Sequence, residues 1–225
     1  MIVPYICASD NSRVTIVKNA ESVKRARGRP RAFDRQHALE TAARTFWRLG
    51  YEGASIADLT MALGITPQSL YAAFTSKADL YREALAWYRS DPGANTARTL
   101  AEEKDVIVAL SRVLTDSAAA FSGDETPPGC MISTAILTCA EENQPIADHV
   151  AALRSGALKM FEQRIRGGIK EGQLAADTNI EGLARFIGAI VQGMSVQARD
   201  GAKTDELSAI ADQAVEYLRT IAAKK

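Results

Sequence analysis

The sequence predicts an all-α protein in which a small N-terminal helical unit is joined by a helix to a larger helical domain. Three helix starts follow one another between Ser55 and Leu80. Ala, Leu and Ile dominate the hydrophobic residues, which make up 47% of the chain, a composition that favours helices. Runs of β-branched residues with period-two alternation, which would indicate strands, are missing. We expect a disordered basic arm over 1–30, a small helical unit over 31–78 and a larger helical domain over 79–225.

The first of the three helix starts carries the spacing of a capping box. Ser55 is followed three residues later by Asp58, so each side chain can accept the other's backbone N–H. Gly64 ends this helix after Leu63, because glycine tolerates the left-handed backbone beyond a last turn. The sequence therefore predicts a helix of about two turns, followed by a tight turn.

The next two starts follow at once. Thr66 caps a second short helix, and Pro67 stands at its first position, where a missing N–H costs nothing. This helix ends near Phe74. Ser76 then caps a third helix, again with an acid, Asp79, three residues later.

Two short helices joined by a tight glycine turn form the helix-turn-helix arrangement. Leu70 and Phe74 share the inward face of the second helix. The outward positions are Gln68, Ser69, Tyr71 and Ala72. A polar, lightly built face suits a helix that enters a major groove about 12 Å wide.

Residues 64–80, which read Gly-Ile-Thr-Pro-Gln-Ser-Leu-Tyr-Ala-Ala-Phe-Thr-Ser-Lys-Ala-Asp-Leu, resemble the DNA-binding signature of the tetracycline-repressor (TetR) family. The resemblance extends from about Arg31 to Tyr88, and the remainder matches only in length and helical character. It implies a cytoplasmic transcription factor, usually a repressor, that leaves DNA when a small molecule fills its C-terminal domain.

The resemblance also implies roles for single residues. The implied DNA-contacting positions are Ser55, Thr66, Pro67, Gln68, Ser69, Tyr71 and Lys77. Gln68 carries an amide that can pair with adenine through two hydrogen bonds, whereas Tyr71 and Lys77 would hold phosphates. Pro67 and the pair Ala72-Ala73 depart from the residues that many members carry, so the operator sequence does not follow from the resemblance.

The basic residues concentrate at the front of the chain. Through Lys77 there are 11 Lys and Arg against 6 Asp and Glu, and beyond it 16 against 21. Arg27, Arg29 and Arg31 lie in the arm, where Arg27-Gly28-Arg29-Pro30 resembles the core of an AT-hook, a minor-groove binder. We predict that the arm binds double-stranded DNA. The alternatives are that the arm is a solvated basic tail and that the charge asymmetry is chance clustering.

Beyond the first helix, expected over 35–49, the sequence predicts further helices over 77–90, 101–121, 130–141, 145–171, 180–199 and 205–223. An apolar ligand pocket lined by Phe121, Met131, Ile136, Met160 and Phe161 is one interpretation of the C-terminal domain. An ordinary helical core is the equal alternative.

The last two helices each carry a broad apolar face. The candidate positions for a homodimer seam are Phe186, Ile190, Met194, Ala214, Tyr217 and Leu218. Two such faces from each chain would form a four-helix seam, and a two-fold axis matches the two half-sites of an operator. Completion of the chain's own core is the alternative.

Other classes of protein find little support. Cys7, Cys130 and Cys139 are too few and wrongly spaced for a metal site, and their odd number fits a reducing cytoplasm. No apolar run reaches the roughly 18 residues that a membrane span needs, so we expect no membrane partner. We expect no cofactor and no enzyme activity, because His149 near Cys139 has no supporting catalytic motif.

Cys130 follows Gly129 at an expected helix start, which would lower the pKa of its thiol and make it a sensor of oxidants; a buried structural cysteine is the alternative. The predicted function is a dimeric, ligand-responsive repressor. The alternative is a helical ligand-binding or interaction protein with only non-specific affinity for nucleic acid.

Overall fold

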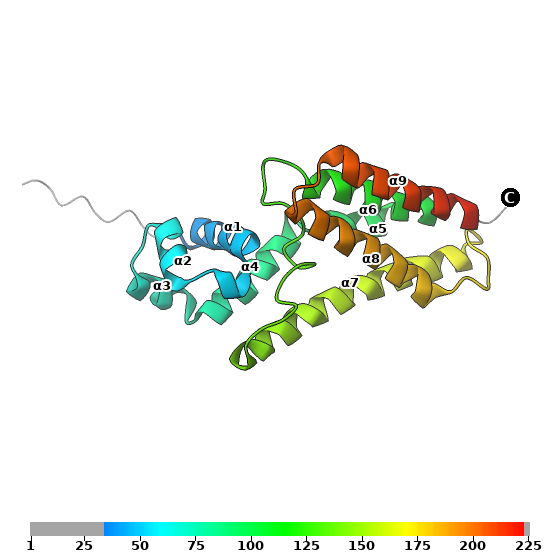
Figure 1. The fold of residues 1–225 in the computed structure, drawn as a ribbon. Coiled ribbons are helices and arrows are strands. Elements are labelled where there is room, and N and C mark those ends of the chain that lie inside the picture. Colours follow the sequence, from blue (N-terminus) through cyan, green and yellow to red (C-terminus); the bar gives the residue numbers. More distant parts are fainter. Residues whose placement is uncertain (1–33, 223–225) are drawn as a thin grey trace, which may run out of the picture. The chain divides into compact units, whose positions relative to one another are not determined.

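A computed structural model describes residues 34–222, and this range contains only helices and the segments between them (Figure 1). The helices are α1 (Arg35–Gly53), α2 (Ile56–Leu63), α3 (Pro67–Phe74), α4 (Lys77–Ser90), α5 (Asn95–Glu102), α6 (Val106–Phe121), the 3-10 turn η1 (Glu141–Asn143), α7 (Gln144–Lys170), α8 (Ile180–Arg199) and α9 (Thr204–Ile221). The all-α prediction is confirmed. The arm, 1–30, lies outside the described residues, as does Arg31.

The helix starts predicted for α1 to α4 are all present. The Asp34 carboxylate accepts from the first turn of α1. In α2, the Ser55 hydroxyl accepts from the Asp58 N–H at 3.0 Å, and the Asp58 carboxylate accepts from the Ser55 N–H at 2.9 Å. The Thr66 and Ser76 hydroxyls cap α3 and α4 by accepting from the N–H groups of Ser69 and Asp79. These caps satisfy N–H groups that a helix leaves unpaired, so they fix where each short helix begins.

Helices α1 to α4 close around one aromatic core. Phe46 of α1 lies edge-on to Tyr81 of α4, with ring centroids 4.9 Å apart. Leu59 of α2 and Leu70 of α3 are fully buried against this core. Arg35 bridges the helices from outside, since its guanidinium pairs with Glu83 at 2.8 Å. The core fixes the angle between α2 and α3, and hence the direction in which α3 faces outward.

The five helices α5 to α9 together form a second hydrophobic core. Helix α6 packs against α5, α8 and α9, and α7 packs against α8. The fully buried members include Leu110, Leu114, Ile165, Ile187 and Met194. No helix within the described range has both the length and the apolar character needed to cross a membrane.

One predicted helix in this part is wrong, and the last helix begins within one residue of its predicted start. The segment predicted as one helix over 101–121 is two helices, because the Asp105 carboxylate accepts from the N–H groups of Ile107 and Val108 and starts α6 anew. Helix α9 is capped by Glu206, whose carboxylate accepts from the Lys203 N–H at 2.8 Å. The Thr204 hydroxyl is instead bonded to Ser122 at 2.8 Å.

The helix predicted over 130–141 is also wrong. Residues 122–140, which we call the connecting loop, contain turns and bends but no helix. Gly129 and Ile136 have φ of 74° and 37°, which an α-helix excludes. Side chains from other helices also hydrogen-bond to the loop backbone. The Cys130 N–H donates to the Ser195 hydroxyl at 2.7 Å, and the Ala135 carbonyl accepts from the Arg154 guanidinium at 2.9 Å. Tertiary hydrogen bonds here replace the helical ones.

Replacement of Gly129 by alanine tests how strongly this loop is held. A Cβ at Gly129 would lie 2.6 Å from the Ser195 carbonyl and would need the left-handed backbone. We expect Gly129→Ala to lower the free energy of unfolding by about 2 kcal/mol or more, measured by urea denaturation. Gly156→Ala is the matched control, since a Cβ there meets nothing within 4 Å in helix α7, and it should raise stability by roughly 0.5–1 kcal/mol. Equal effects of the two variants would contradict the strain at Gly129.

Candidate nucleic-acid interface and adjoining cavity

Helix α3 presents a continuous polar face to solvent. Its inward residues Leu70 and Phe74 are 0% and 1% exposed, which anchors the helix in the core. The outward positions, all exposed, are Thr66, Pro67, Gln68, Ser69 and Tyr71. The structure thus brings five of the sequence-predicted positions onto one surface of one helix. This surface offers an amide and three hydroxyl groups, the groups that hydrogen-bond to bases and phosphates.

Ser55 and Lys77 flank this surface from the starts of α2 and α4. The Ser55 hydroxyl donates to the Asp58 carboxylate at 2.6 Å, so it is already engaged in the cap. The Lys77 ammonium lies 4.5 Å from the centre of the Tyr51 ring. Partial burial lowers the pKa of Lys77, and attraction to Glu52 and Asp58 opposes that shift. Lys77 is therefore held at a helix N-terminus, where its charge adds to that of the free N–H groups.

The helical part of this interface carries no net charge. Residues 34–77 contain four basic side chains, Arg35, Arg44, Arg48 and Lys77, and four acidic ones. Arg35 is moreover paired with Glu83. The excess of basic residues lies in 1–33, which hold seven Lys and Arg against two Asp and Glu. The described helices supply shape and hydrogen-bonding groups, whereas most of the positive charge belongs to the preceding segment.

A cavity of about 750 Å³ adjoins these helices. Helices α1, α4, α5, α6, α7 and α8 and the connecting loop all contribute to its wall. Three of the predicted ligand-binding residues, Phe121, Met160 and Phe161, line it. Met131 and Ile136 do not: they are 2% and 8% exposed and pack into the core of α1 to α4. The wall is mainly apolar and aromatic, as is usual for small-molecule sites.

Trp47 of α1 connects the cavity to the core of α1 to α4. Its ring lines the cavity, and its indole N–H donates to the Gly129 carbonyl at 3.0 Å in a buried hydrogen bond. Its own backbone carbonyl accepts from the Arg199 guanidinium of α8. Sequence reasoning missed this role, although a second large aromatic beside Phe46 is unusual in so small a unit.

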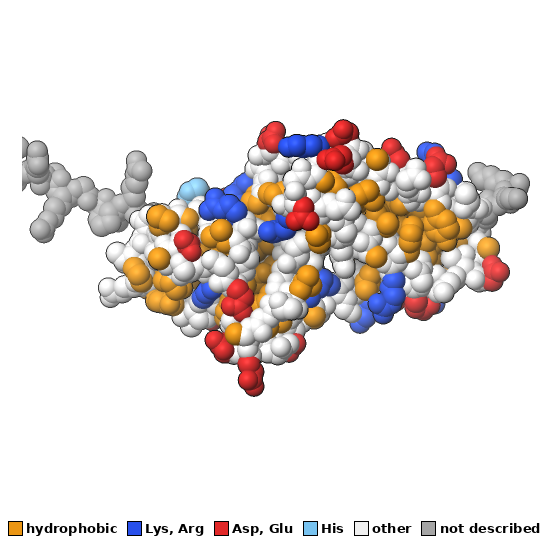
Figure 2. All heavy atoms as spheres, viewed as in Figure 1, with side chains coloured by type: hydrophobic (Ala, Val, Ile, Leu, Met, Phe, Trp, Pro, Cys, Tyr) orange, Lys and Arg blue, Asp and Glu red, His pale blue; other side chains and the backbone are white. Residues whose placement is uncertain are grey.

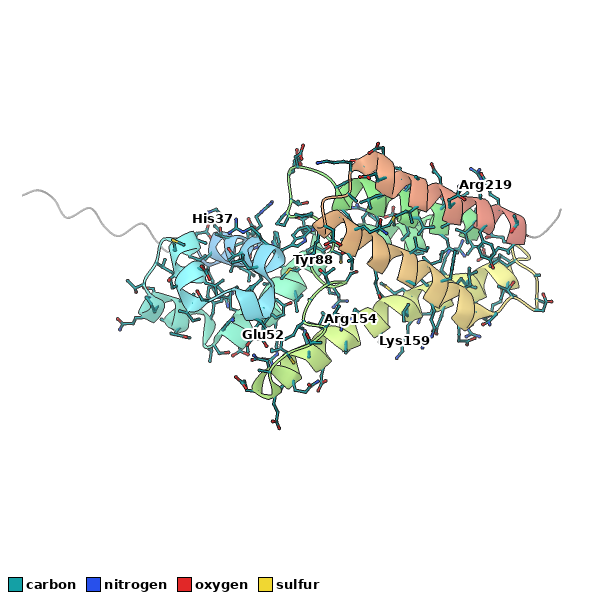
Figure 3. The ribbon with its side chains drawn as sticks, viewed as in Figure 1. His37, Glu52, Tyr88, Arg154, Lys159 and Arg219 are labelled. Atoms are coloured by element: carbon teal, nitrogen blue, oxygen red, sulfur yellow. The ribbon has the colours of Figure 1, made fainter. Side chains whose placement is uncertain are left out.

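Further side chains approach the connecting loop from three helices, and Figure 3 marks one on each: Glu52 on α1, Tyr88 on α4 and Arg154 on α7. The Glu52 carboxylate accepts from the Ala140 N–H at 3.2 Å and from the Asn143 amide at 2.9 Å. The loop that borders the cavity on one side is thus bonded to α1 on the other.

Cys130 of the loop lines the cavity, but no helix begins there, so the helix start expected beside its thiol is not present. Its sulfur accepts from the Tyr88 hydroxyl at 3.3 Å and from the Ile132 N–H at 3.4 Å. Burial raises the pKa of Tyr88, and the nearby Cys130 adds to that effect. Tyr88 therefore stays a neutral donor to the sulfur.

The predicted seam residues separate into two groups. Met194, Ala214 and Leu218 are no more than 2% exposed and belong to the chain's own core. Phe186, Ile190 and Tyr217 remain accessible, and the rings of Phe186 and Tyr217 lie edge-on at 5.1 Å. Figure 2 shows hydrophobic side chains gathered between α8 and α9 on the visible face.

Two family models match the chain. One, described as bacterial regulatory proteins of the tetR family, matches residues 38–84, and the other, the tetracyclin repressor-like C-terminal domain, matches 108–220. The HTH-type transcriptional repressor ComR of Escherichia coli K12 is 34% identical over 194 residues, which cover 86% of this chain and 92% of ComR. The HTH-type transcriptional repressor BdcR of the same organism is 30% identical over 197 residues, which cover 88% of this chain and 95% of BdcR.

Among solved structures, a cysteine mutant of the TetR family transcriptional regulator CifR, complexed with 26-base-pair double-strand operator DNA, is 42% identical. The two folds agree with a TM-score of 0.80 over 84% of this chain and 98% of the other. A TetR regulator from Rhodococcus is 38% identical, with a TM-score of 0.56 over 82% of this chain and 99% of that one.

Removal of the Trp47 indole N–H should weaken the link between α1 and the connecting loop. Trp47→Phe leaves the Gly129 carbonyl without its donor, so we expect a loss of about 1–3 kcal/mol in the free energy of unfolding. Trp87→Phe is the matched control, because Trp87 is only half-buried, and it should cost less than about 1 kcal/mol. Urea denaturation measures both, and equal losses would mean that the Trp47 hydrogen bond adds nothing to stability.

Proposed function

The chain belongs to the TetR family of bacterial regulatory proteins, and on that premise we propose that it is a dimeric repressor that a small molecule releases from its operator. Its relatives are DNA-binding transcriptional regulators, and CifR was solved with double-strand operator DNA. The observation that carries the proposal is the outward face of α3, which is polar, unobstructed by other described residues and anchored by two buried side chains.

In the proposed complex, α3 enters the major groove. Gln68 and Ser69 face base edges, and the Gln68 amide suits adenine because it carries one donor and one acceptor side by side. Thr66, Tyr71 and Lys77 hold phosphates at the two ends of the helix, and Ser55 and Pro67 pack against the backbone beside them. The DNA-binding unit ends within α4, near residue 78, so that a continuous helix joins it to the remainder of the chain.

The basic arm supplies the electrostatic part of DNA affinity in this proposal. Because residues 34–77 have no net charge, contacts by Arg27, Arg29 and Arg31 to phosphates or to a narrow minor groove would account for most of the salt dependence. Since the operator is chromosomal DNA, we place the protein in the cytoplasm.

Release from DNA would begin in the cavity. A ligand that contacts Phe121, Met160 and Phe161 would also meet Trp47 and the connecting loop, which line the same space. Because that loop is bonded to α1 through Gly129, a shift of the loop would move α1 and with it the core that orients α3. A ligand alters DNA affinity only if it binds the DNA-bound and free conformations unequally, and this loop is where we propose the two differ.

The test of DNA recognition is fluorescence anisotropy with a duplex from upstream of the protein's own gene, a scrambled duplex as control, and a salt series. We expect at least 10³-fold preference for one duplex. Gln68→Ala should reduce specific binding by about 1–3 kcal/mol, and Gln213→Ala, an exposed glutamine on α9, should not.

Equal, steeply salt-dependent binding of both duplexes, followed by a random-library selection that enriches no sequence, would contradict specific recognition. That outcome would favour the second interpretation, a helical ligand-binding protein with only non-specific affinity for nucleic acid.

The dimer seam has its own test. Tyr217 is 48% exposed beside Phe186 and Ile190, so Tyr217→Glu should place an unpaired charge in the seam and shift the protein to monomers in sedimentation velocity. Val108→Glu is the control, because Val108 is similarly exposed on α6, and it should remain dimeric. If the Tyr217 variant sediments as the unaltered protein does, the seam lies elsewhere.

A further inference from the structure

One part of the cavity wall is polar. Helix α6 presents Asp116, Ser117, Ala120 and Phe121 to the cavity. Ser117 is only 6% exposed, and its hydroxyl makes no hydrogen bond to another residue of 34–222. Its oxygen remains accessible in the cavity wall, so a molecule that enters the cavity can hydrogen-bond to it.

Asp116 beside it keeps one oxygen free. Its Oδ2 accepts from the Asn95 amide at 3.0 Å, and within the described chain no Lys, Arg or His pairs with it. Asn95 is itself fixed, because its Oδ1 accepts from the Arg98 guanidinium at 3.0 Å and a guanidinium only donates. Asn95 thus turns its amide N–H groups toward Asp116, and the remaining carboxylate oxygen of Asp116 accepts a hydrogen bond only from a ligand or solvent.

The other charged groups of the wall are differently placed. Arg89 and Glu125 are exposed, so solvent screens them. Arg154 is half-buried, but its guanidinium already donates to the carbonyls of Ile132 at 3.3 Å and Ala135 at 2.9 Å. At the α5–α6 side of the cavity the free Asp116 oxygen can only accept, and the Ser117 hydroxyl can accept or donate; rings such as Trp47 and Phe161 line the same space.

We propose that this cavity takes a small molecule with an apolar, ring-containing body and a protonated amine, in which the ammonium pairs with Asp116 and donates to Ser117. The inference rests on the proposed function only in that it names the ligand of the same cavity. An ammonium satisfies the two free acceptors at once, and the charge-assisted hydrogen bond is the stronger kind. The body packs against Phe121 and Phe161, which provide the apolar contact.

The test compares three probes that share one bicyclic body and a two-carbon arm: naphthylethylamine, naphthylethanol and naphthylacetate. Binding to the purified full chain is measured by titration calorimetry. We expect the amine to bind at least about tenfold more tightly than the acetate, with the alcohol between them. Asp116→Asn should weaken the amine about tenfold and leave the alcohol within about twofold, and Ser117→Ala should weaken both.

Asp212→Asn is the matched control, because Asp212 is an exposed carboxylate on α9 outside the cavity wall, and it should leave all three affinities unchanged. If the acetate binds most tightly, if no probe binds, or if Asp116→Asn leaves the amine unaffected, the proposed amine site is wrong.

A second measurement, of operator affinity with and without the amine, separates this inference from the proposed function. Amine binding that depends on Asp116 but leaves DNA affinity unchanged supports the amine site and contradicts release by this cavity. Specific DNA binding together with tightest binding of the acetate supports the repressor and overturns the amine site.

Discussion

The hydrogen bond from the Trp47 indole to the Gly129 carbonyl ties the two halves of the described structure together. Trp47 belongs to the helix that carries Phe46, the centre of the core around α3, and Gly129 belongs to the loop that borders the cavity. The Trp47 carbonyl is in turn held by Arg199. Because interiors are close-packed, a displacement of this loop would be passed on to α1. The hydrogen bonds of Glu52 to Ala140 and of Tyr88 to Cys130 join the loop to α1 and α4 as well, so the two parts meet through several contacts.

In the proposed complex, affinity and specificity for DNA would come from different parts of the chain. Residues 34–77 are electrically balanced, so α3 contributes hydrogen-bonding groups and a fixed orientation but little long-range attraction. The seven basic residues of 1–33 would provide that attraction to any duplex. An arrangement of this kind lets the charged segment find DNA while the small face around Gln68 discriminates between sequences.

The sequence predicted the first four helices because their signals are local. A cap such as Ser55 with Asp58 acts within one turn, and the structure confirms it. The apolar character of 130–141 alone predicts a helix, yet its backbone is bonded to Glu52, Arg154 and Ser195, which are distant in sequence. The same limit applies to the candidate sites. The face of α3 follows from periodicity, whereas the positions of Met131, Ile136 and Met194 depend on which helices meet.

What a family shares and what one member recognises are set by different residues. The caps of α2 and α3 and the buried Leu70 and Phe74 fix a fold that many sequences reach, and they carry no information about the ligand. Ligand choice depends on the few polar groups in an otherwise apolar wall, since each unpaired group there must be matched by the molecule that enters. Asp116 and Ser117 are such groups, and the other α6 residues of the cavity wall, Ala120 and Phe121, are apolar. A relative that differs at these two positions would keep the fold and the link through Trp47 but respond to another chemistry.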